Sequence, residues 1–370
     1  MKKIYYITAV FATLFLVGCG DGIDLPGVNV ETDLNKIPLP DNNVNLEQVE
    51  LKPSTEPMLH EGLHTEEDFQ RIRDKKAAGE EPWVSAYQLL VESQFSQKTA
   101  DTYPTEWIKR GVSGDENYMN AARGATIVYQ QALRWKIEQD DEYAAKAVEN
   151  LNKWVQTCVG VTGNTNLSLA AGLYGYEFAI AGELLRDYGG WDRTDFAAFQ
   201  NWLLKVFYPA NDDFLKRHHD TNALHYWANW CLCNIAAKMA IGIVTDRRDI
   251  YNEGIAHLQT GDTNGRLRRA IYHDYAPDYN FAQWQESGRD QGHTLMCVGL
   301  MGVICQLAWS QGDDFFAYDD NLFLRACEYA ACCNYTNETV PYTTYIWQKQ
   351  SQWGYPIPEE QTTLGGGKWI

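Results

Sequence analysis

The chain has 370 residues, 22% of them charged, and a formal net charge of −18 at pH 7. This acidity excludes the class of proteins that bind nucleic acid through a basic surface, because phosphate backbones are neutralised by Lys and Arg. It does not exclude an acidic sugar polymer as a partner, because a cleft can be locally basic on an acidic protein. Residues 216–219 (Lys-Arg-His-His) and 266–269 (Arg-Leu-Arg-Arg) are candidates for such a local field, although either cluster is also typical of a solvated surface.

The first nineteen residues have the features of an export signal. Two lysines precede an apolar stretch, residues 4–17, which is too short to cross a bilayer as a helix. The tetrad Leu-Val-Gly-Cys that ends at Cys19 resembles a bacterial lipobox, which implies cleavage before Cys19 and lipid attachment to its thiol. A plain signal peptide with a chance cysteine is the alternative. We expect residues 1–19 to be removed and the mature protein to be exported and anchored to the bacterial membrane, in the periplasm or at the cell surface.

Residues 20–57 are rich in Asp, Asn, Pro, Val and Glu and have no amphipathic periodicity. This composition is typical of a flexible linker. Folding is expected to begin near Met58, and residues 58–370 are enough for one large domain.

Within that domain, apolar residues recur at helical spacing almost throughout, in segments separated by Gly, Pro, Asn and Asp. Strand-like alternation is scarce, so the predicted fold class is all-α. The clearest predicted helices are 67–78, 83–94, 116–138, 141–158, 167–188, 193–207, 221–244, 248–258, 290–311 and 319–334.

Two kinds of helix alternate along the chain. Segment 141–158 has a charged face, whereas 167–188, 221–244 and 290–311 are apolar nearly all round and must be buried on every side. An inner ring of buried helices wrapped by amphipathic ones, as in an incomplete α/α toroid of antiparallel hairpins, satisfies both patterns. A solenoid of the tetratricopeptide type would satisfy them too, but its repeat of about 34 residues is not evident.

Polar groups mark the start of the predicted helix 221–244. Asn222, His225 and Asn229 stand at i, i+3 and i+7, so a helix would bring them to one face, with Tyr226 four residues after Asn222. Such groups at the mouth of a buried helix need partners, and a substrate is one candidate. His225 alone is equally well explained as a core histidine whose ring nitrogens are hydrogen-bonded within the protein.

A denser cluster stands at the head of the predicted helix 290–311. Glu286, Arg289, Asp290 and His293 precede a long apolar run, and the four-residue step from Arg289 to His293 allows their side chains to converge. Charged groups that enter a core need partners, and such clusters are more often sites than accidents. Clustered aromatic residues, which suit either core packing or stacking on sugars, include Tyr174 and Trp230.

The segments 222–230 (Asn-Ala-Leu-His-Tyr-Trp-Ala-Asn-Trp) and 285–293 (Gln-Glu-Ser-Gly-Arg-Asp-Gln-Gly-His) resemble those of alginate lyase superfamily proteins, especially exported Bacteroidetes lipoproteins that act on polyuronates. Segments 58–64 and 174–185 support the resemblance, which covers about residues 58–347. It implies an α/α toroid and cleavage of alginate, polymannuronate or glucuronan by β-elimination, without a redox cofactor. No metal is expected, since the chain lacks a paired Cys-x-x-Cys pattern. Because relatives continue through further closing helices, the resemblance also implies a domain shortened at its C-terminus.

Removal of the C5 proton of a uronate places negative charge on its carboxylate, so the site needs cationic donors, a base and an acid for the departing O4. The resemblance makes His225 the expected base and Arg289 the carboxylate clamp. Tyr279 is the expected acid, with Tyr226 and Tyr272 as alternatives, and His293 polarises the leaving group or positions that tyrosine. In the family the Asn and His are adjacent, so whether Asn222 or Asn229 faces the carboxylate stays open. The expected substrate-binding residues are Asn166, Tyr174, Tyr226, Asn229, Trp230, Gln285 and Glu286.

Two other functions remain open. A glycoside hydrolase on the same kind of toroid would use Glu286 or Asp290 as general acid, but Arg289 between the two carboxylates would hold both ionised. A non-catalytic lipoprotein that captures glycan in an aromatic groove would have no turnover to lose when His225 is replaced.

Overall fold

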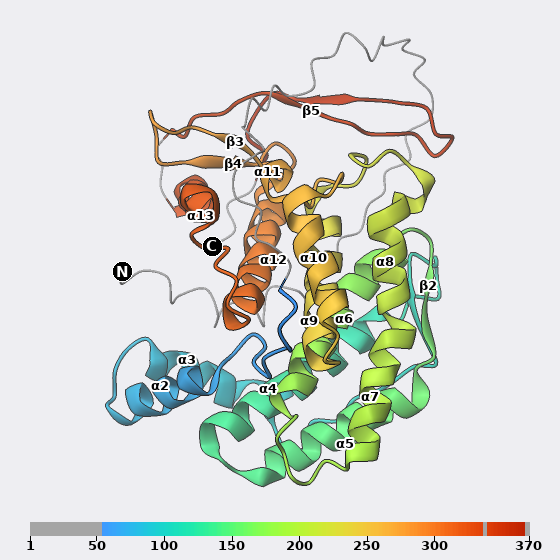
Figure 1. Cartoon of the computed structure of the whole chain (residues 1–370), viewed down its shortest axis with the longest axis vertical. Helices are drawn as coiled ribbons and strands as arrows, with labels where there is room; N and C mark the ends of the chain where they lie inside the picture. Colours follow the sequence, from blue (N-terminus) through green and yellow to red (C-terminus); the bar gives the residue numbers. More distant parts are fainter. Residues whose placement is uncertain (1–53, 336–338, 367–370) are drawn as a thin grey trace.

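The computed structural model describes residues 54–335 and 339–366 (Figure 1). The predicted signal segment with Cys19, and the linker up to residue 53, lie outside the described residues.

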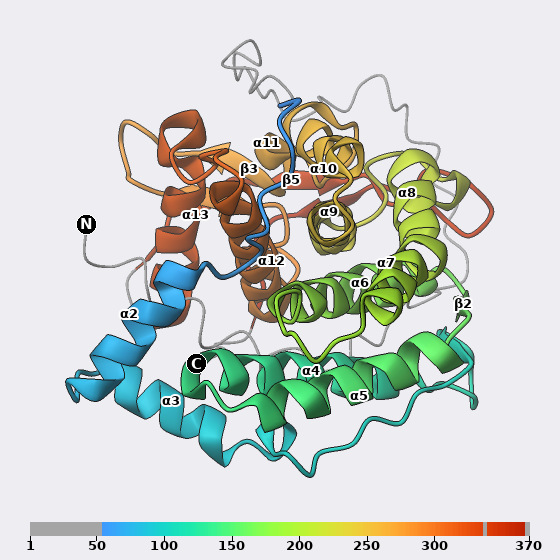
Figure 2. The same cartoon turned by 60° about the horizontal axis from the view of Figure 1, so that its bottom comes forward.

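Four inner helices form the centre of the molecule: α4 (Tyr118–Glu138), α6 (Leu167–Leu184), α9 (Ala228–Val244) and α12 (Gln291–Ser310). The outer helices are α5 (Asp141–Thr157), α7 (Arg193–Val206), α10 (Arg248–Thr260) and α13 (Tyr318–Tyr335). Sixteen of the 18 residues of α6 are buried but only seven of the 17 residues of α5, so the inner and outer classes differ as the sequence predicts. The all-α class and the α/α toroid are confirmed (Figure 1, Figure 2).

Small residues let the inner helices approach one another closely. A Cβ atom at Gly172 of α6 would lie 2.5 Å from the Cys233 sulfur of α9, so glycine is required at that contact. Two of the outer helices begin at capped turns. The carboxylate of Asp140 accepts a hydrogen bond from the Glu142 amide at the start of α5, and Asp192 accepts one from the Thr194 amide before α7.

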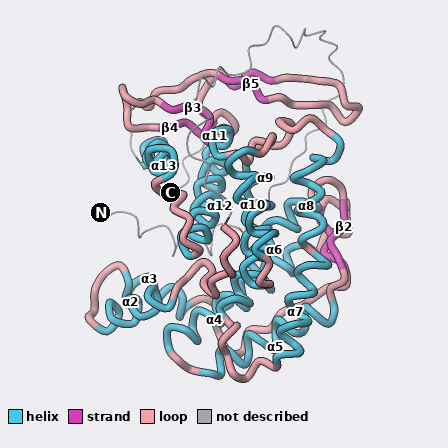
Figure 3. The backbone as a smooth tube through the Cα atoms, in the orientation of Figure 1, coloured by secondary structure: helices cyan, strands magenta, loops and turns pink. Residues whose placement is uncertain are grey.

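The strands form three two-stranded sheets. β1 (Trp107–Arg110) pairs in parallel with β2 (Gly160–Gly163), and two antiparallel pairs join β3 (Ile271–Asp274) to β4 (Ala282–Trp284) and β5 (Tyr345–Trp347) to β6 (Glu359–Gln361). Figure 3 shows that β3, β4 and β5 gather at one end of the helices. The remaining elements are α2 (Glu66–Ala77), α3 (Trp83–Glu92), α8 (Tyr208–Arg217), α11 (Leu267–Ala270), η4 (Gln94–Ser96) and η5 (His218–Asp220). Helix α8 and the two hairpins were not predicted.

One predicted helix begins seven residues late. The prediction placed its start at Thr221, but α9 starts at Ala228 and residues 221–227 form a loop. The Oδ1 atom of Asn222 accepts a hydrogen bond from the Leu224 amide at 2.9 Å, a local contact that competes with helix formation. The expectation that Asn222, His225 and Asn229 share one helix face is therefore wrong.

The segment before α2 crosses the end of the toroid opposite the hairpins (Figure 2). Gln311, which follows α12, donates hydrogen bonds to the carbonyls of Leu59 and Glu61 at 3.0 and 2.7 Å and accepts one from the Leu59 amide at 2.9 Å. Arg248 donates to the carbonyls of Glu56 and Pro57, which sequence analysis had placed in the linker.

Replacement of Gln311 by Ala is expected to lower the free energy of unfolding by about 1–3 kcal/mol, because it removes three part-buried hydrogen bonds to the backbone of Leu59 and Glu61. Urea denaturation of the variant beside Gln306→Ala, a control within α12, measures this. Gln306 is partly exposed and its side chain makes no hydrogen bond that holds the segment. Equal unfolding free energies of the two variants would show that the Gln311 side chain does not stabilise the attachment of the segment before α2.

Candidate active site

The candidate site lies at the N-terminal ends of α9 and α12, the end that the two hairpins cover (Figure 1). Asp290 is the N-cap of α12, and its carboxylate accepts a hydrogen bond from the His293 amide at 2.7 Å. The same carboxylate lies 2.6 Å from Nδ1 of the His293 ring. Burial raises the pKa of Asp290, but the two hydrogen bonds from His293 and the charges of His293 and Arg289 outweigh it, so the pKa lies below its usual value. An ionised Asp290 accepts the Nδ1–H, which leaves Nε2 of a neutral His293 unprotonated.

Glu286 joins α12 to α9. Its side chain is fully buried, and its Oε1 atom accepts hydrogen bonds from the amide and the Nδ2 of Asn229 at 2.8 and 2.6 Å. Its Oε2 atom accepts one from Arg289 at 3.2 Å. Asn229 and Glu286 therefore hold the start of α9 and the Arg289 side chain in a fixed relation, a positioning arrangement that gives a substrate little access to either.

Arg289 lies between two carboxylates and over an indole. Its Nε atom is 3.8 Å from Asp290, in addition to the Glu286 contact, and its guanidinium lies 5.3 Å from the centre of the Trp227 ring. The side chain keeps 23% of its surface exposed. A planar, partly exposed guanidinium held in this way can pair with an incoming carboxylate.

His225 and Arg289 are linked through two indoles. The rings of Trp227 and Trp347 stack with centres 4.3 Å apart, and the His225 ring stacks on Trp347 at 6.3 Å. Since Arg289 lies over Trp227, a chain of ring contacts connects His225 to Arg289. The structure brings both residues to the same end of the toroid, although not into contact.

The His225 ring is fixed by the β5–β6 hairpin. Its Nδ1 atom accepts a hydrogen bond from the Gln350 amide at 2.8 Å, and its carbonyl accepts one from Trp347 Nε1 at 2.7 Å. Burial, reinforced by the charge of Lys349, lowers the pKa of His225 from 6.5 to about 4. The ring is therefore neutral near pH 7 and carries its proton on Nε2, so it can donate a hydrogen bond there but is a weak base.

The pH dependence of stability tests this state of His225. Because its pKa is lower in the folded than in the unfolded chain, its contribution is complete above pH 6.5 and is lost as the pH falls towards 4. Between these values we expect the unfolding free energy of a His225→Gln variant to fall less steeply than that of the unmodified protein. Urea titrations at several pH values measure both slopes, and equal slopes would contradict the lowered pKa.

Asn222 is exposed and holds the hairpin. Its amide N–H donates to the Gln350 side chain at 2.9 Å, and its Nδ2 donates to the Gln348 carbonyl at 3.1 Å. Gln285 is buried and its Oε1 accepts a hydrogen bond from the Ala228 amide at 3.0 Å, at the first turn of α9. The Asn222 contacts therefore stabilise the hairpin, and the Gln285 contact stabilises the start of α9.

Tyr226 and Trp230 pack beside His225. The Tyr226 ring centre lies 4.8 Å from that of His225 and 4.7 Å from that of Trp230, and burial raises the pKa of Tyr226 to about 12. Tyr174 is buried and stacks with Tyr118. Asn166, just before α6, is half-buried and donates to the side chain of its neighbour Asn164.

Tyr279, the expected acid, lies between β3 and β4 with 55% of its surface exposed. Among the described residues its ring contacts Tyr275, with centres 6.5 Å apart, and the structure shows no contact with Arg289 or His225. The alternative Tyr272 is buried and donates to the Thr344 carbonyl at 3.0 Å. Among the described residues neither tyrosine has a contact with the Arg289 guanidinium, but Tyr272 shares a buried cluster with Trp227, over which Arg289 lies.

The part of the site that comes from residues 342–350 was not predicted from the sequence. Tyr345 donates to the Gln285 carbonyl and accepts a hydrogen bond from the Gly288 amide at 3.2 Å, so it fixes the turn before Arg289. Trp347 stacks with both His225 and Trp227. Nothing in the sequence of residues 342–347 indicated that they contact the turn before α12.

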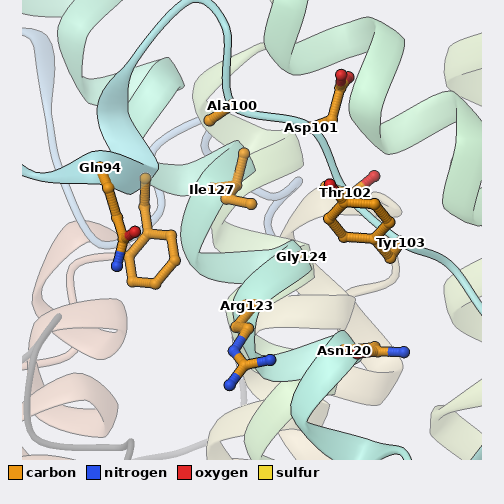
Figure 4. Close-up of a pocket in the computed structure, with 10 residues that line it drawn as sticks. Gln94, Ala100, Asp101, Thr102, Tyr103, Asn120, Arg123, Gly124 and Ile127 are labelled. Carbon is orange, nitrogen blue, oxygen red and sulfur yellow. The ribbon is translucent and has the colours of Figure 1, made fainter.

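A separate pocket of about 220 Å³ lies between α4 and residues 94–103 (Figure 4). Its polar lining includes Gln94, Asp101, Asn120 and Arg123. None of the residues that sequence analysis selected lines this pocket.

Comparison with solved structures finds alginate lyase folds. A histidine-to-alanine variant of alginate lyase A1-III complexed with tetrasaccharide matches with a TM-score of 0.58 and 14% identity over 77% of this chain and 82% of that chain. A tyrosine-to-phenylalanine variant, also complexed with tetrasaccharide, gives 0.56 and 14% over 75% and 79%. Alginate lyase A1-III from Sphingomonas species A1 gives 0.53 and 13% over 75% and 80%. At these identities the likeness establishes the fold.

No curated protein matches the chain at a significant level. Among protein families, the one described as Alginate lyase matches residues 72–338. That match spans most of the chain and includes α4, α6, α9 and α12 with the polar cluster at the head of α12. The protein therefore belongs to the alginate lyase family and is a polysaccharide lyase.

Proposed function

We propose that the protein cleaves a polyuronate, either alginate and its polymannuronate blocks or glucuronan, by β-elimination at the head of α12. The observation that carries the proposal is the grouping of Arg289 with the Asp290–His293 pair at the partly exposed head of a buried helix. The tetrasaccharide complexes of alginate lyase A1-III support a saccharide as substrate.

Arg289 binds the carboxylate of the uronate whose C5 proton is removed. Its fork can pair bidentately with a carboxylate, and Trp227 and Glu286 hold its plane. Charge that develops on the carboxylate as the proton leaves is then neutralised by a cation already in place.

His293 is the base in this proposal. Its Nδ1–H is directed at Asp290, so Nε2 takes the C5 proton, and the carboxylate stabilises the imidazolium that forms. As the C5–H electrons form the C4–C5 double bond, the C4–O4 bond breaks and O4 leaves with its electron pair. The imidazolium then returns the proton to O4, which restores neutral His293 and needs no cofactor.

His225, which the sequence favoured as base, serves instead as a hydrogen-bond donor to substrate oxygen through Nε2–H. Its occupied Nδ1 and its lowered pKa support that role. Tyr226 and Trp230, which pack beside it, supply the apolar wall of a sugar-binding surface.

The glycoside hydrolase reading finds no support in the two carboxylates. Glu286 is fully buried and accepts hydrogen bonds from Asn229 and Arg289. The lowered pKa of Asp290 leaves it ionised, so it has no proton for a leaving group.

The masses of the products test the proposal. Elimination gives a chain with an unsaturated end that is one water lighter than the corresponding hydrolysis product. Mass spectrometry after incubation with polymannuronate, polyguluronate and glucuronan is expected to find the lighter species with at least one of them. Only water-added products would mean hydrolysis, and unchanged polymer retained on the protein would mean a binder.

We also propose that the protein is exported and held to a membrane by lipid on Cys19. The charged start, the short apolar stretch and the Leu-Val-Gly-Cys tetrad support this. A Cys19→Ala variant is expected to move from the membrane fraction to the soluble fraction and to lose labelling by a fatty-acid probe, and unchanged fractionation would contradict the anchor.

A further inference from the structure

The β5–β6 hairpin continues beyond its paired strands into an ordered turn. At its tip the Ser351 amide donates to the Tyr355 carbonyl at 2.8 Å and the Gly354 amide donates to the Ser351 carbonyl at 2.9 Å. The Tyr355 amide donates to the Ser351 hydroxyl at 3.0 Å, and Gly354 adopts a φ of 82° that favours glycine. The tip therefore has a defined conformation set by its own hydrogen bonds.

This tip presents aromatic side chains to water. Trp353 and Tyr355 are 76% and 69% exposed, so their rings contribute little to the core. Two large rings on one well-defined turn are typical of a binding surface, because burial against a partner would release the water that they order.

Charge at the tip does not oppose an acidic glycan. Residues 351–358 (Ser-Gln-Trp-Gly-Tyr-Pro-Ile-Pro) contain no ionisable acid. At the base of the turn Lys349 lies 3.4 Å from Glu359, so that carboxylate is partly neutralised.

The same hairpin is bonded to the candidate active site. The Gln350 amide donates to Nδ1 of His225 and Trp347 Nε1 donates to the His225 carbonyl, while Asn222 holds Gln348 and Gln350. Figure 1 shows the hairpin across the end of the inner helices where the site lies. The segment that carries the tip is therefore attached directly to a residue of the candidate site.

We propose that Trp353 and Tyr355 form a distal stacking subsite for sugar rings of the same polyuronate chain whose cleavage is proposed above, on which this inference rests. The apolar faces of the sugars pack on the two rings, and the subsite holds long chains at the site without contacting the bond that breaks. Short oligosaccharides that fill only the positions near His225 and Arg289 do not reach it.

Steady-state kinetics with substrates of two lengths test the subsite. Trp353→Ala and Tyr355→Ala are each expected to raise KM for the polymer about tenfold, with kcat unchanged and with KM for a tetrasaccharide unchanged. Trp309→Ala is the matched control, because Trp309 is 54% exposed near the C-terminal end of α12, opposite the site. A polymer KM equal to that of Trp309→Ala in both variants would overturn the proposal.

Affinity electrophoresis in gels that contain polymannuronate, polyguluronate or glucuronan tests the same subsite without turnover. One of the polymers is expected to retard the unmodified protein and Trp309→Ala, and to retard Trp353→Ala less. Weaker retardation of Trp353→Ala, without product from any polymer, would contradict the proposed lyase reaction but support the subsite. Equal retardation of Trp353→Ala and Trp309→Ala, or no retardation of the unmodified protein, would overturn the subsite.

Discussion

Replacement of Arg289 by Lys is expected to lower kcat/KM on a polyuronate by about 100- to 1,000-fold, the usual effect of removing one preorganised donor from developing negative charge. Lysine keeps the charge, but it cannot present two parallel N–H groups to a carboxylate or stack flat over Trp227. Initial rates at several substrate concentrations measure the loss. Because the interaction strengthens as charge develops, kcat should fall as well as the apparent affinity.

The control for this experiment is Arg268→Lys. Arg268 is partly buried on α11 and forms ion pairs with Asp274 and Asp319, as Arg289 does with its own carboxylates, but it lies outside the proposed site. We expect this variant to retain the activity of the unmodified protein. If Arg289→Lys were as active as Arg268→Lys, Arg289 would not be the carboxylate clamp.

Replacement of His293 by Ala is expected to lower kcat by about 100- to 10,000-fold, the range for loss of a general base. Asp290→Asn should lower kcat by less, because the ring remains while its orientation and the stabilisation of the imidazolium are weakened. Since Asp290 also caps α12, circular dichroism and urea denaturation of each variant must accompany the rates.

The turnover of His225→Ala, compared with that of His293→Ala, decides which of the two histidines is the base. If His293 is the base, His225→Ala loses only a hydrogen-bond donor and part of the hairpin attachment, so it is expected to retain more turnover than His293→Ala. His273→Ala, a half-buried histidine of β3, controls for the substitution itself. If His225→Ala abolished turnover while His293→Ala stayed active, His225 would be the base, as the resemblance implied.

The toroid was predictable because its inner helices differ from ordinary amphipathic ones. Helices α6 and α12 have apolar residues on every face, and a helix of that kind is stable only where other helices surround it. The cluster from Glu286 to His293 was predictable for a related reason, since its members are close in sequence and at helical spacing.

The features that could not be predicted depend on contacts between residues that are far apart in the sequence. Residues 221–227 continue an apolar pattern into α9, but side-chain contacts between Asn222 and a hairpin more than 120 residues later keep them in a loop. The ring contacts that connect His225 to Arg289 through Trp347 and Trp227 likewise depend on pairing between distant segments. Hydrophobic periodicity along the sequence gives no information about such pairing. The single-residue roles of His225 and Tyr279 were assigned without those contacts.

Ultraviolet absorbance during incubation with purified polyuronates is the direct measurement of β-elimination by this protein, because only elimination creates the conjugated 4,5-unsaturated uronate. The unmodified protein is expected to give a steady rise on polymannuronate, polyguluronate or glucuronan, and folded His293→Ala is expected to give almost none. No rise on any of the three polymers with the folded, unmodified protein would contradict β-elimination of a polyuronate at the head of α12.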